Sequence, residues 1–486
     1  MGGFTELPYT SVSEIPHIIK TLNQSFLDGK TQSTLWRKNQ LRRLWRMLDE
    51  HETAFQDALF QDSGKLKLEG QLFELTLVKN DILHLLQELD AWLAPEAVSV
   101  PPPFQFWQPT VHKQPKGTCL IIAPWNYPIC LTMLPLAAMI ASGNTSIIKL
   151  SELSPNVALL LTELLPKYID DSCYRIVNGA VEVTTSLLDS PYGHILYTGN
   201  NVIGKVIMAA ASKHLTPVTL ELGGKSPVII SEHSNIPLAA KRTAWGKFFN
   251  AGQTCMCPDY ALVDEKVLMD FLDQFKQITT KFYGSGTAHR MARIINSKHW
   301  IRLTSLLDST KGTKLTLGDS SPSSQSTLFI PPTVITGLTL EDPMLESEIF
   351  GPILPILTYT SLDEVPNIIA QIDPTPLGLY MFTEDMAEAS MIRASTASGG
   401  MAINDVMAHV AVTSLAFGGF GTSGMGSYRG KAGIDTLSHR KSVATVPTTT
   451  EFESLLEWRY VDGDQEAKYQ EFKATLDGKL VEEQEK

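Results

Sequence analysis

The stretch TCLIIAPWNYPICLTMLPLAAMIASGNTSIIKL, residues 118–150, decides the fold of this chain. Its first six residues form a short apolar run that is typical of a buried strand. Residues 127–142 predict a buried helix, and residues 145–150 predict a second buried strand. Two buried strands joined by a helix are the unit of a parallel sheet that is covered by helices on both faces. We therefore predict an α/β fold.

The same alternation of strands and helices continues along the chain, in two series that meet near residue 221. The strands that we expect are 174–177, 194–198, 227–230, 260–263, 353–359 and 378–382. The helices that we expect lie at 154–166, 201–212, 236–250, 266–281, 362–371 and 385–397. This pattern predicts two α/β domains.

Two other segments contain many polar residues. Within residues 35–60, Leu41, Leu44 and Leu48 recur at helical spacing, so we predict one helix there. We interpret the basic residues on its other side as a solvated face rather than a recognition surface. These residues are Arg37, Lys38, Arg42, Arg43 and Arg46. The polar, turn-rich segment 313–327 predicts a surface loop.

The negative charge of the chain excludes partners that are polyanions. The 486 residues carry a formal net charge of −12, from 40 basic and 52 acidic residues. Non-specific binding to nucleic acid or to an anionic membrane requires clustered lysine and arginine, so neither partner is expected. Half of this charge, a net −6 from eleven acids and five bases, lies in residues 451–486.

The cysteines and the apolar segments bear on the compartment. Five scattered cysteines do not form a disulfide framework, so we predict a reducing, cytoplasmic location. The N-terminal residues lack the charged and apolar regions of a secretory signal. Residues 119–143 carry no charge, but three prolines interrupt them and would leave backbone groups that lipid cannot satisfy. We therefore expect no membrane span.

Two glycine patterns resemble nucleotide-binding loops without matching them. Residues 199–206 approach a P-loop, but Val206 stands where a hydroxyl would hold Mg²⁺. A helix that starts after Gly199 can still bind a phosphate through its free N–H groups. Residues 419–424 fit G-x-G-x-x-G, but no apolar strand leads into them, so we interpret them as a turn.

Four polar residues are candidates for chemistry. Cys255 follows a predicted helix, although a lone cysteine is more often a small buried hydrophobe. The pair with Cys257 lacks the second pair of a zinc site, so we predict no metal. Asn126 and Glu221 follow predicted strands, at the edge where α/β sheets bind ligands. Glu348 stands beside an aromatic residue, and each of these polar side chains could instead be structural.

Seven motifs, in their order along residues 116–445, resemble those of the aldehyde dehydrogenases. They are PWNYP (124–128), GNTSIIKLSE (143–152), TGNNVIG (198–204), ELGGKSP (221–227), GQTC (252–255), EIFGP (348–352) and FGGFGTSGMG (417–426). The residues after the cysteine motif and the stretch 427–442 resemble the class 3 branch. The resemblance implies a Rossmann-like cofactor domain, an α/β catalytic domain and a small bridging element.

The resemblance also implies roles for the candidates. Cys255 corresponds to the nucleophile, which forms a thiohemiacetal and then a thioester with the aldehyde. Asn126, with the backbone N–H of Cys255, corresponds to the oxyanion hole. Glu221 corresponds to the usual base for hydrolysis, and Glu348 is a rival base. Coenzyme A-acylating relatives generally lack the glutamate of ELGG, so that reaction and an inactive scaffold are the less favoured alternatives.

For the cofactor, the resemblance implies NAD, with NADP possible. The expected contacts are with the riboses, the pyrophosphate and the nicotinamide, from Lys149, Glu152, Gly199, Gly204, Gly223, Glu348 and Phe350. A carboxylate such as that of Glu152 accepts hydrogen bonds from ribose hydroxyls. The class 3 branch further implies a homodimer, and the apolar segments imply a hydrophobic aliphatic or aromatic aldehyde.

The expected domains follow from the same order of motifs. They are an NAD(P)-binding domain at 1–95 and 116–220, a catalytic domain at 221–425, oligomerisation or bridging segments at 96–115 and 426–450, and an acidic C-terminal tail at 451–486.

Overall fold

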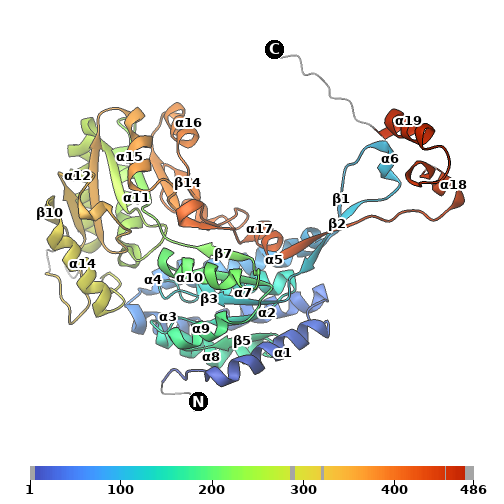
Figure 1. Cartoon of the computed structure of the whole chain (residues 1–486). Helices are drawn as coiled ribbons and strands as arrows, with labels where there is room; N and C mark the ends of the chain where they lie inside the picture. The colour runs from blue at the N-terminus through green and yellow to red at the C-terminus, as the bar shows by residue number, and fades with distance from the viewer. Residues whose placement is uncertain (1–5, 285–289, 319–321, 455, 477–486) are drawn as a thin grey trace. The chain divides into compact units, whose positions relative to one another are not determined.

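Three β-sheets organise the part of the chain that a computed structural model describes (Figure 1). The described residues are 6–284, 290–318, 322–454 and 456–476. They divide into two compact units, of which the first comprises Met1–Trp92 and Pro115–Leu437 and the second Leu93–Gln114 and Ser438–Lys486. The first unit holds the two large sheets and every candidate site residue.

The first sheet has six strands in the order β15-β7-β6-β3-β4-β5. They are β3 (Thr118–Ile122), β4 (Thr145–Lys149), β5 (Tyr174–Val177), β6 (His194–Thr198), β7 (Val218–Glu221) and β15 (Gly424–Met425). β3 to β7 are parallel, and β15 pairs antiparallel with β7. The chain leaves β3 first toward β4 and later toward β6, so a crevice opens between the carboxyl ends of β3 and β6.

Helices cover both faces of this sheet. The helices around it are α1 (Ile15–Leu27), α7 (Cys130–Ser142), α8 (Pro155–Tyr168), α9 (Val181–Leu188) and α10 (Asn201–Ser212). Leu120 and Ile122 of β3 share a core with α1, α9 and α10. α7 is buried along its whole length and contacts β3 and β4. The uncharged segment 119–143 is therefore a buried strand, a loop and a buried helix.

The second sheet has seven strands in the order β10-β11-β12-β9-β8-β13-β14. They are β8 (Pro227–Ile230), β9 (Tyr260–Asp264), β10 (Thr313–Thr316), β11 (Thr333–Thr336), β12 (Ile353–Tyr359), β13 (Gly378–Phe382) and β14 (Gly400–Ile403). Alternate residues of its central strands enter different cores, as Val228 and Ile230 join one and Ile229 the other.

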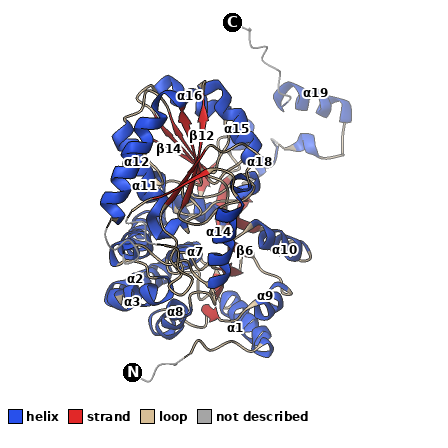
Figure 2. Cartoon of the chain, turned by 90° about the vertical axis from the view of Figure 1, so that its left-hand side faces the viewer, coloured by secondary structure: helices blue, strands red, loops and turns tan. Residues whose placement is uncertain are grey.

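Those two cores lie under different helices. α11 (Ile236–Phe248) and α12 (Leu268–Tyr283) cover one face of the second sheet, and α15 (Val365–Ile372) and α16 (Met386–Ser395) cover the other (Figure 2). α14 (Ser297–Ser309) adds Leu303 to the first of these cores. The predicted α/β fold, with helices on both faces of parallel strands, is confirmed.

The prediction of a loop at 313–327 is wrong at its start. Residues 313–316 form β10, which pairs antiparallel with β11 at the edge of the second sheet. All four residues of β10 are exposed, so no apolar face marks the strand in the sequence. The two threonines favour an extended backbone there, and pairing with β11 holds the segment as a strand.

Two predictions for the N-terminal helices are also wrong. The expected helix at 35–60 is two helices, α2 (Thr34–Glu50) and α3 (Glu52–Ser63), which meet at His51. Arg37 does not lie on a solvated face but is buried, and its guanidinium donates to the carbonyls of Thr31 and Ala141. It thereby supplies donors to a carbonyl near the end of α7, which the apolar helix cannot satisfy itself.

Three further helical segments follow α3 along the chain, and one more follows the strands of the second sheet. They are α4 (Lys67–Gly70), a π-helical turn (Gln71–Thr76), α5 (Leu77–Leu93) and α17 (Gly430–Thr436). Among the described residues, none of the helices combines the length and the apolar composition that a membrane span needs.

The second unit is a small sheet with short helices. β1 (Glu96–Ala97), β2 (Thr110–Pro115) and β16 (Ser438–Val443) form the sheet, and α6 (Pro102–Gln105), α18 (Thr450–Ser454) and α19 (Gln465–Leu476) complete the unit. Glu96 binds Lys113 and Arg440, which joins the two segments of chain that build it.

Candidate active site

Asn126 lies in the loop between β3 and α7, at the carboxyl edge of the first sheet. Its side chain is buried, and its amide donates to the carbonyl oxygen of Gln253 at 3.1 Å. An amide nitrogen carries two N–H groups, so this bond leaves one donor for another acceptor. The bond also places Asn126 beside the turn that carries Cys255.

The turn before Cys255 depends on an unusual backbone. α11 ends at Phe248, and Asn250, Ala251 and Gly252 then take positive φ angles of 49°, 54° and 72°. Asparagine and glycine tolerate this region, whereas alanine there is strained. A Cβ on Gly252 would overlap the carbonyl oxygen of Gly351, so only glycine fits this close approach.

Cys255 follows at a tight turn and is partly exposed, unlike the other four cysteines, which are buried. The N–H of Cys257 donates to the carbonyl of Thr254 at 2.9 Å, and the Thr254 and Tyr127 hydroxyls share a hydrogen bond of 2.6 Å. Burial raises the pKa of the Cys255 thiol, and the carboxyl groups of Glu348 and Glu221 raise it further. The resting residue is therefore a thiol that faces two acids.

Glu221 is the last residue of β7 and is only 2% exposed. Neither carboxyl oxygen has a hydrogen-bond partner among the described residues. Burial therefore raises the pKa of Glu221 well above its ordinary value. A carboxyl group without partners is free to bind a substrate or a water.

Glu348 approaches the same place from the second sheet. Burial raises its pKa to about 8, and the negative charge of Asp259 raises it as well, while a hydrogen bond from the Gly224 N–H opposes the shift. A buried pair of Lys225 with Asp259 fixes the loop, because Lys225 also donates to the carbonyl of Ser347 at 2.9 Å. A Cβ on Gly223 would overlap the Glu348 carboxyl group, so any larger residue would displace that side chain.

These residues come from opposite edges of the two sheets. Asn126 and Glu221 lie at the carboxyl ends of β3 and β7, whereas Cys255 and Glu348 precede β9 and β12 and so lie at amino ends. The structure thus brings together all four candidates for chemistry that the sequence indicated.

The candidate cofactor residues lie around the carboxyl ends of β4 and β6. The side chain of Asn200 caps α10 by accepting from the N–H of Ile203 at 3.0 Å, and Gly199 donates to the carbonyl of Glu221 at 3.0 Å. Gly204 packs closely on Leu222, which brings the start of α10 to the end of β7. The free N–H groups at a helix start favour a phosphate.

Two further groups complete the candidate cofactor site. Lys149 is buried at the end of β4 and donates to Glu152 at 2.9 Å, which leaves the second oxygen of that carboxylate without this bond. Phe350 has a φ of 51°, an outlier for a bulky side chain, and its ring meets Trp125 edge to face at 5.4 Å. Strained residues of this kind cluster at ligand sites.

A comparison with known families agrees with this geometry. The model of the aldehyde dehydrogenase family matches residues 4–443. The chain belongs to the aldehyde dehydrogenase family. The resemblance that the seven motifs carried is thereby confirmed.

Several of its relatives are named as members of aldehyde dehydrogenase family 3. The dimeric NADP-preferring aldehyde dehydrogenase of Canis lupus familiaris is 40% identical over 438 residues, 90% of this chain and 95% of that protein. The 4,4'-diaponeurosporen-aldehyde dehydrogenase of Staphylococcus aureus is 41% identical over 87% of this chain and 93% of that protein. The substrate-bound structure of Staphylococcus aureus AldH superposes with a TM-score of 0.88 at 38% identity, over 95% of this chain and 99% of that one.

The protein is therefore an aldehyde dehydrogenase that uses NAD or NADP to oxidise an aldehyde. The predicted function class, cofactor and Rossmann-like α/β fold are confirmed. The residues that carry the reaction are assigned below as proposals.

Three polar residues of this aldehyde dehydrogenase contact the candidate site and were not predicted from the sequence. Lys65 donates to the backbone carbonyl of Asn126, Glu74 binds Lys65, and the Asn250 amide donates to the carbonyls of Asn126 and Gln253. One signal was available, because Glu74 interrupts an apolar run and such a charge is costly to bury without a partner. Its partner Lys65, nine residues earlier in the chain, is not distinguished by any such signal in the sequence.

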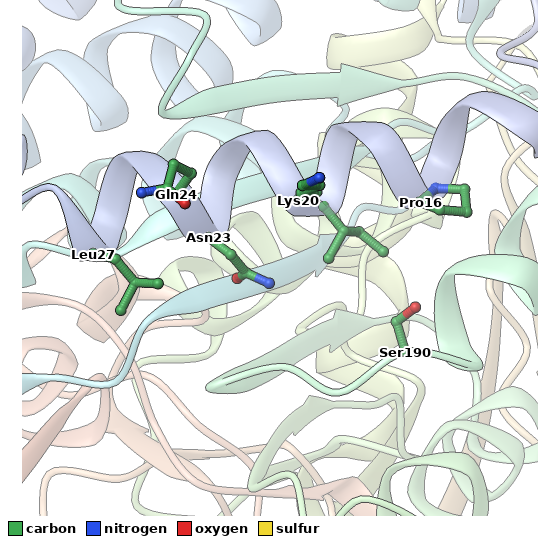
Figure 3. A pocket seen from close by; sticks show the side chains of 7 residues that line it. Pro16, Lys20, Asn23, Gln24, Leu27 and Ser190 are labelled. Carbon is green, nitrogen blue, oxygen red and sulfur yellow. The ribbon is translucent and has the colours of Figure 1, made fainter.

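A separate hollow of the dehydrogenase has different chemistry. It has a volume of about 400 Å³ and lies along α1, with Lys20, Asn23 and Gln24 on the helix and Ser190 opposite (Figure 3). Its lining contains neither a thiol nor a carboxyl group. None of the four candidates for chemistry lines this hollow.

The close approach at Gly252 gives a test of this geometry. We expect Gly252→Ala to lower kcat/KM by about 10²-fold, because the new Cβ displaces the Cys255 turn from the Gly351 loop. Gly337→Ala is the matched control, since Gly337 has the same φ of 72° but no atom within 4 Å of the added Cβ. Steady-state kinetics and thermal unfolding of both variants measure the effect. Equal losses of activity in the two variants would contradict the role of the contact.

Proposed function

We propose that Cys255 is the nucleophile of this aldehyde dehydrogenase and that the thioester it forms is hydrolysed. The observation that carries the proposal is the position of one partly exposed thiol beside an amide donor, Asn126, and two carboxyl groups, those of the buried Glu221 and the partly exposed Glu348. Nucleophile, oxyanion donor and base are the groups that this chemistry requires.

The residues on the first sheet fit an NAD(P) cofactor. The α10 start, with the cap of Asn200 and the glycines 199 and 204, suits the pyrophosphate. The free oxygen of Glu152 suits a ribose hydroxyl, and Lys149 holds that carboxylate in place. When bound, the cofactor supplies a nicotinamide ring that accepts a hydride from the substrate carbon. Gly223, Glu348 and Phe350 are proposed to surround that ring.

In the first half of the reaction, the thiol of Cys255 adds to the aldehyde carbon. The thiol proton passes to a neighbouring carboxylate, and the raised pKa values of Glu221 and Glu348 make either group a suitable acceptor. Negative charge develops on the former carbonyl oxygen. The second N–H of the Asn126 amide and the N–H of Cys255 are proposed to bind it, and such donors typically contribute about 10²–10³ in rate.

In the second half, a carboxylate removes a proton from water, which attacks the thioester and releases the acid. We assign this role to Glu221, because its two oxygens have no partner among the described residues. The Glu348 carboxyl group accepts a hydrogen bond from Gly224 and is assigned to the nicotinamide side.

Cys255→Ser tests the nucleophile. We expect aldehyde-dependent NADH formation to fall by at least about 10³-fold, because a serine hydroxyl is a far weaker nucleophile than a thiol. The dissociation constant of the cofactor, measured by fluorescence titration, stays within about twofold of the wild-type value. Cys173→Ser, at a buried cysteine directly before the edge strand β5, is the control and retains activity. Normal turnover by Cys255→Ser, or strict dependence on added coenzyme A, would overturn the proposal.

Glu221→Gln and Glu348→Gln separate the two acids. We expect Glu221→Gln to keep the first-turnover burst of NADH and to lose steady-state turnover by about 10²–10⁴-fold. Glu348→Gln keeps turnover within about tenfold and raises the KM of the cofactor. Because a base must be deprotonated and both pKa values are raised, wild-type kcat rises as the pH increases through the neutral range and above it. If Glu348→Gln instead loses steady-state turnover while Glu221→Gln keeps it, Glu348 is the base.

We further propose a hydrophobic aldehyde as substrate. Phe73, Trp245 and Phe249 form a cluster of rings tilted against one another beside the Cys255 turn, with ring centroids 4.7–5.9 Å apart. The Staphylococcus aureus relative is named for an apolar polyene aldehyde, which agrees with this assignment. We expect kcat/KM to increase from short to long-chain and aromatic aldehydes, and a preference for acetaldehyde would contradict it.

The assembly and the location are proposed on the same basis. The relatives named as dimeric support a homodimer, and free cysteines support a cytoplasmic location. Sedimentation equilibrium that gives the mass of one chain would exclude the dimer.

A further inference from the structure

The Asn126 amide acts through its position, and its position depends on the loop that carries it. Residues 123–129 connect β3 to α7 and contain two prolines, but no regular secondary structure fixes them. A donor that is displaced by about 1 Å loses most of its effect on a developing charge. Some other contact must therefore hold the backbone of Asn126.

The structure provides that contact from the N-terminal helices. The ammonium group of Lys65, which is 1% exposed, donates to the backbone carbonyl of Asn126 at 2.9 Å. It also lies 4.1 Å from the centre of the Tyr127 ring. Lys65 thus binds two consecutive residues of the loop, one through its carbonyl and one through its aromatic face.

Glu74 completes the arrangement at the other end of the loop. One of its oxygens accepts from Lys65 at 2.6 Å, and its side chain is fully buried. The other oxygen accepts from the N–H groups of Ile129 and Cys130, at 3.0 and 2.9 Å. These are free N–H groups at the start of α7, where a carboxylate is favoured.

Stability does not explain this buried pair. Removing two charges from water costs about as much as their attraction returns, so apolar residues of similar size would serve the fold equally well. What apolar residues could not do is bind the Asn126 carbonyl and the α7 N–H groups at the same time.

A further hydrogen-bond network joins this loop to the nucleophile. The Asn250 amide donates to the carbonyls of Asn126 and Gln253, at 3.2 and 3.0 Å, and Gln253 also accepts from the Asn126 side chain. The oxyanion donor and the Cys255 turn are therefore held by one set of bonds. Lys65 enters that set at the Asn126 carbonyl.

We propose that Lys65 and Glu74 are positioning residues for the oxyanion hole, which fix the Asn126 amide where the substrate oxygen becomes negative. The inference rests on the proposed role of Asn126. It assigns no contact between Lys65 or Glu74 and the substrate.

A double-mutant cycle tests this inference. We expect Lys65→Met to lower kcat/KM by about 10–10²-fold and Asn126→Ala to lower it by about 10²–10³-fold. If Lys65 acts through Asn126, adding Lys65→Met to Asn126→Ala causes no further loss beyond about twofold, because the amide is already absent. Losses that multiply would overturn the inference.

Controls separate this effect from a loss of folded protein. Lys38→Met removes a lysine from an ion pair on the same group of helices, with an exposed partner in Asp90, and retains activity. The cofactor affinity of Lys65→Met stays within about twofold, whereas a variant with general damage loses it. If Lys65→Met does not fold, Lys65→Met with Glu74→Gln avoids an unpaired buried charge and enters the same cycle.

The outcomes also separate the two proposals. If Asn126→Ala is fully active, the proposed oxyanion role fails, and the inference fails with it. If Asn126→Ala is impaired and Lys65→Met is either fully active or additive, the oxyanion role stands and the positioning role of Lys65 is wrong.

Discussion

The hydrogen bond from the Asn126 amide to the Gln253 carbonyl is the constraint on which the active site depends. It joins a loop at the carboxyl edge of one sheet to a turn at the amino edge of another. In the proposed mechanism each sheet carries half of the chemistry, with the oxyanion donor and Glu221 on the first and the thiol and Glu348 on the second. These groups come together because one hydrogen bond joins the two edges.

That meeting requires backbone conformations that are costly elsewhere in a protein. Asn250 and Ala251 adopt the left-handed region, and Gly252 admits a backbone neighbour that a Cβ would exclude. The surrounding core stabilises this strain, since Phe248 and Ala251 are buried in the cluster that packs α11 and α12 on the second sheet. A rigid core and a strained turn are therefore parts of one arrangement.

Much of this could be predicted from the sequence, and the limits have physical causes. Strands such as 194–198 and 227–230 were predicted with their observed bounds, because buried parallel strands are continuous apolar runs. β10 was missed because an exposed edge strand has no apolar face. Arg37 and Lys65 were missed because nothing local distinguishes a lysine or arginine that is buried against backbone carbonyls from one in water. The motifs indicated Cys255 and Asn126, but not the residues that hold them.

The raised pKa values at the reaction centre change what the formal charge means. Glu221 and Glu348 count as two of the 52 acids in the net charge of −12, yet burial raises the pKa of both carboxyl groups and that of the Cys255 thiol. Burial thus favours the neutral form of these acids, as it does for Glu69, whose pKa it raises to about 7. The carboxyl groups beside Cys255 therefore exchange protons at a higher pH than carboxyl groups in water do.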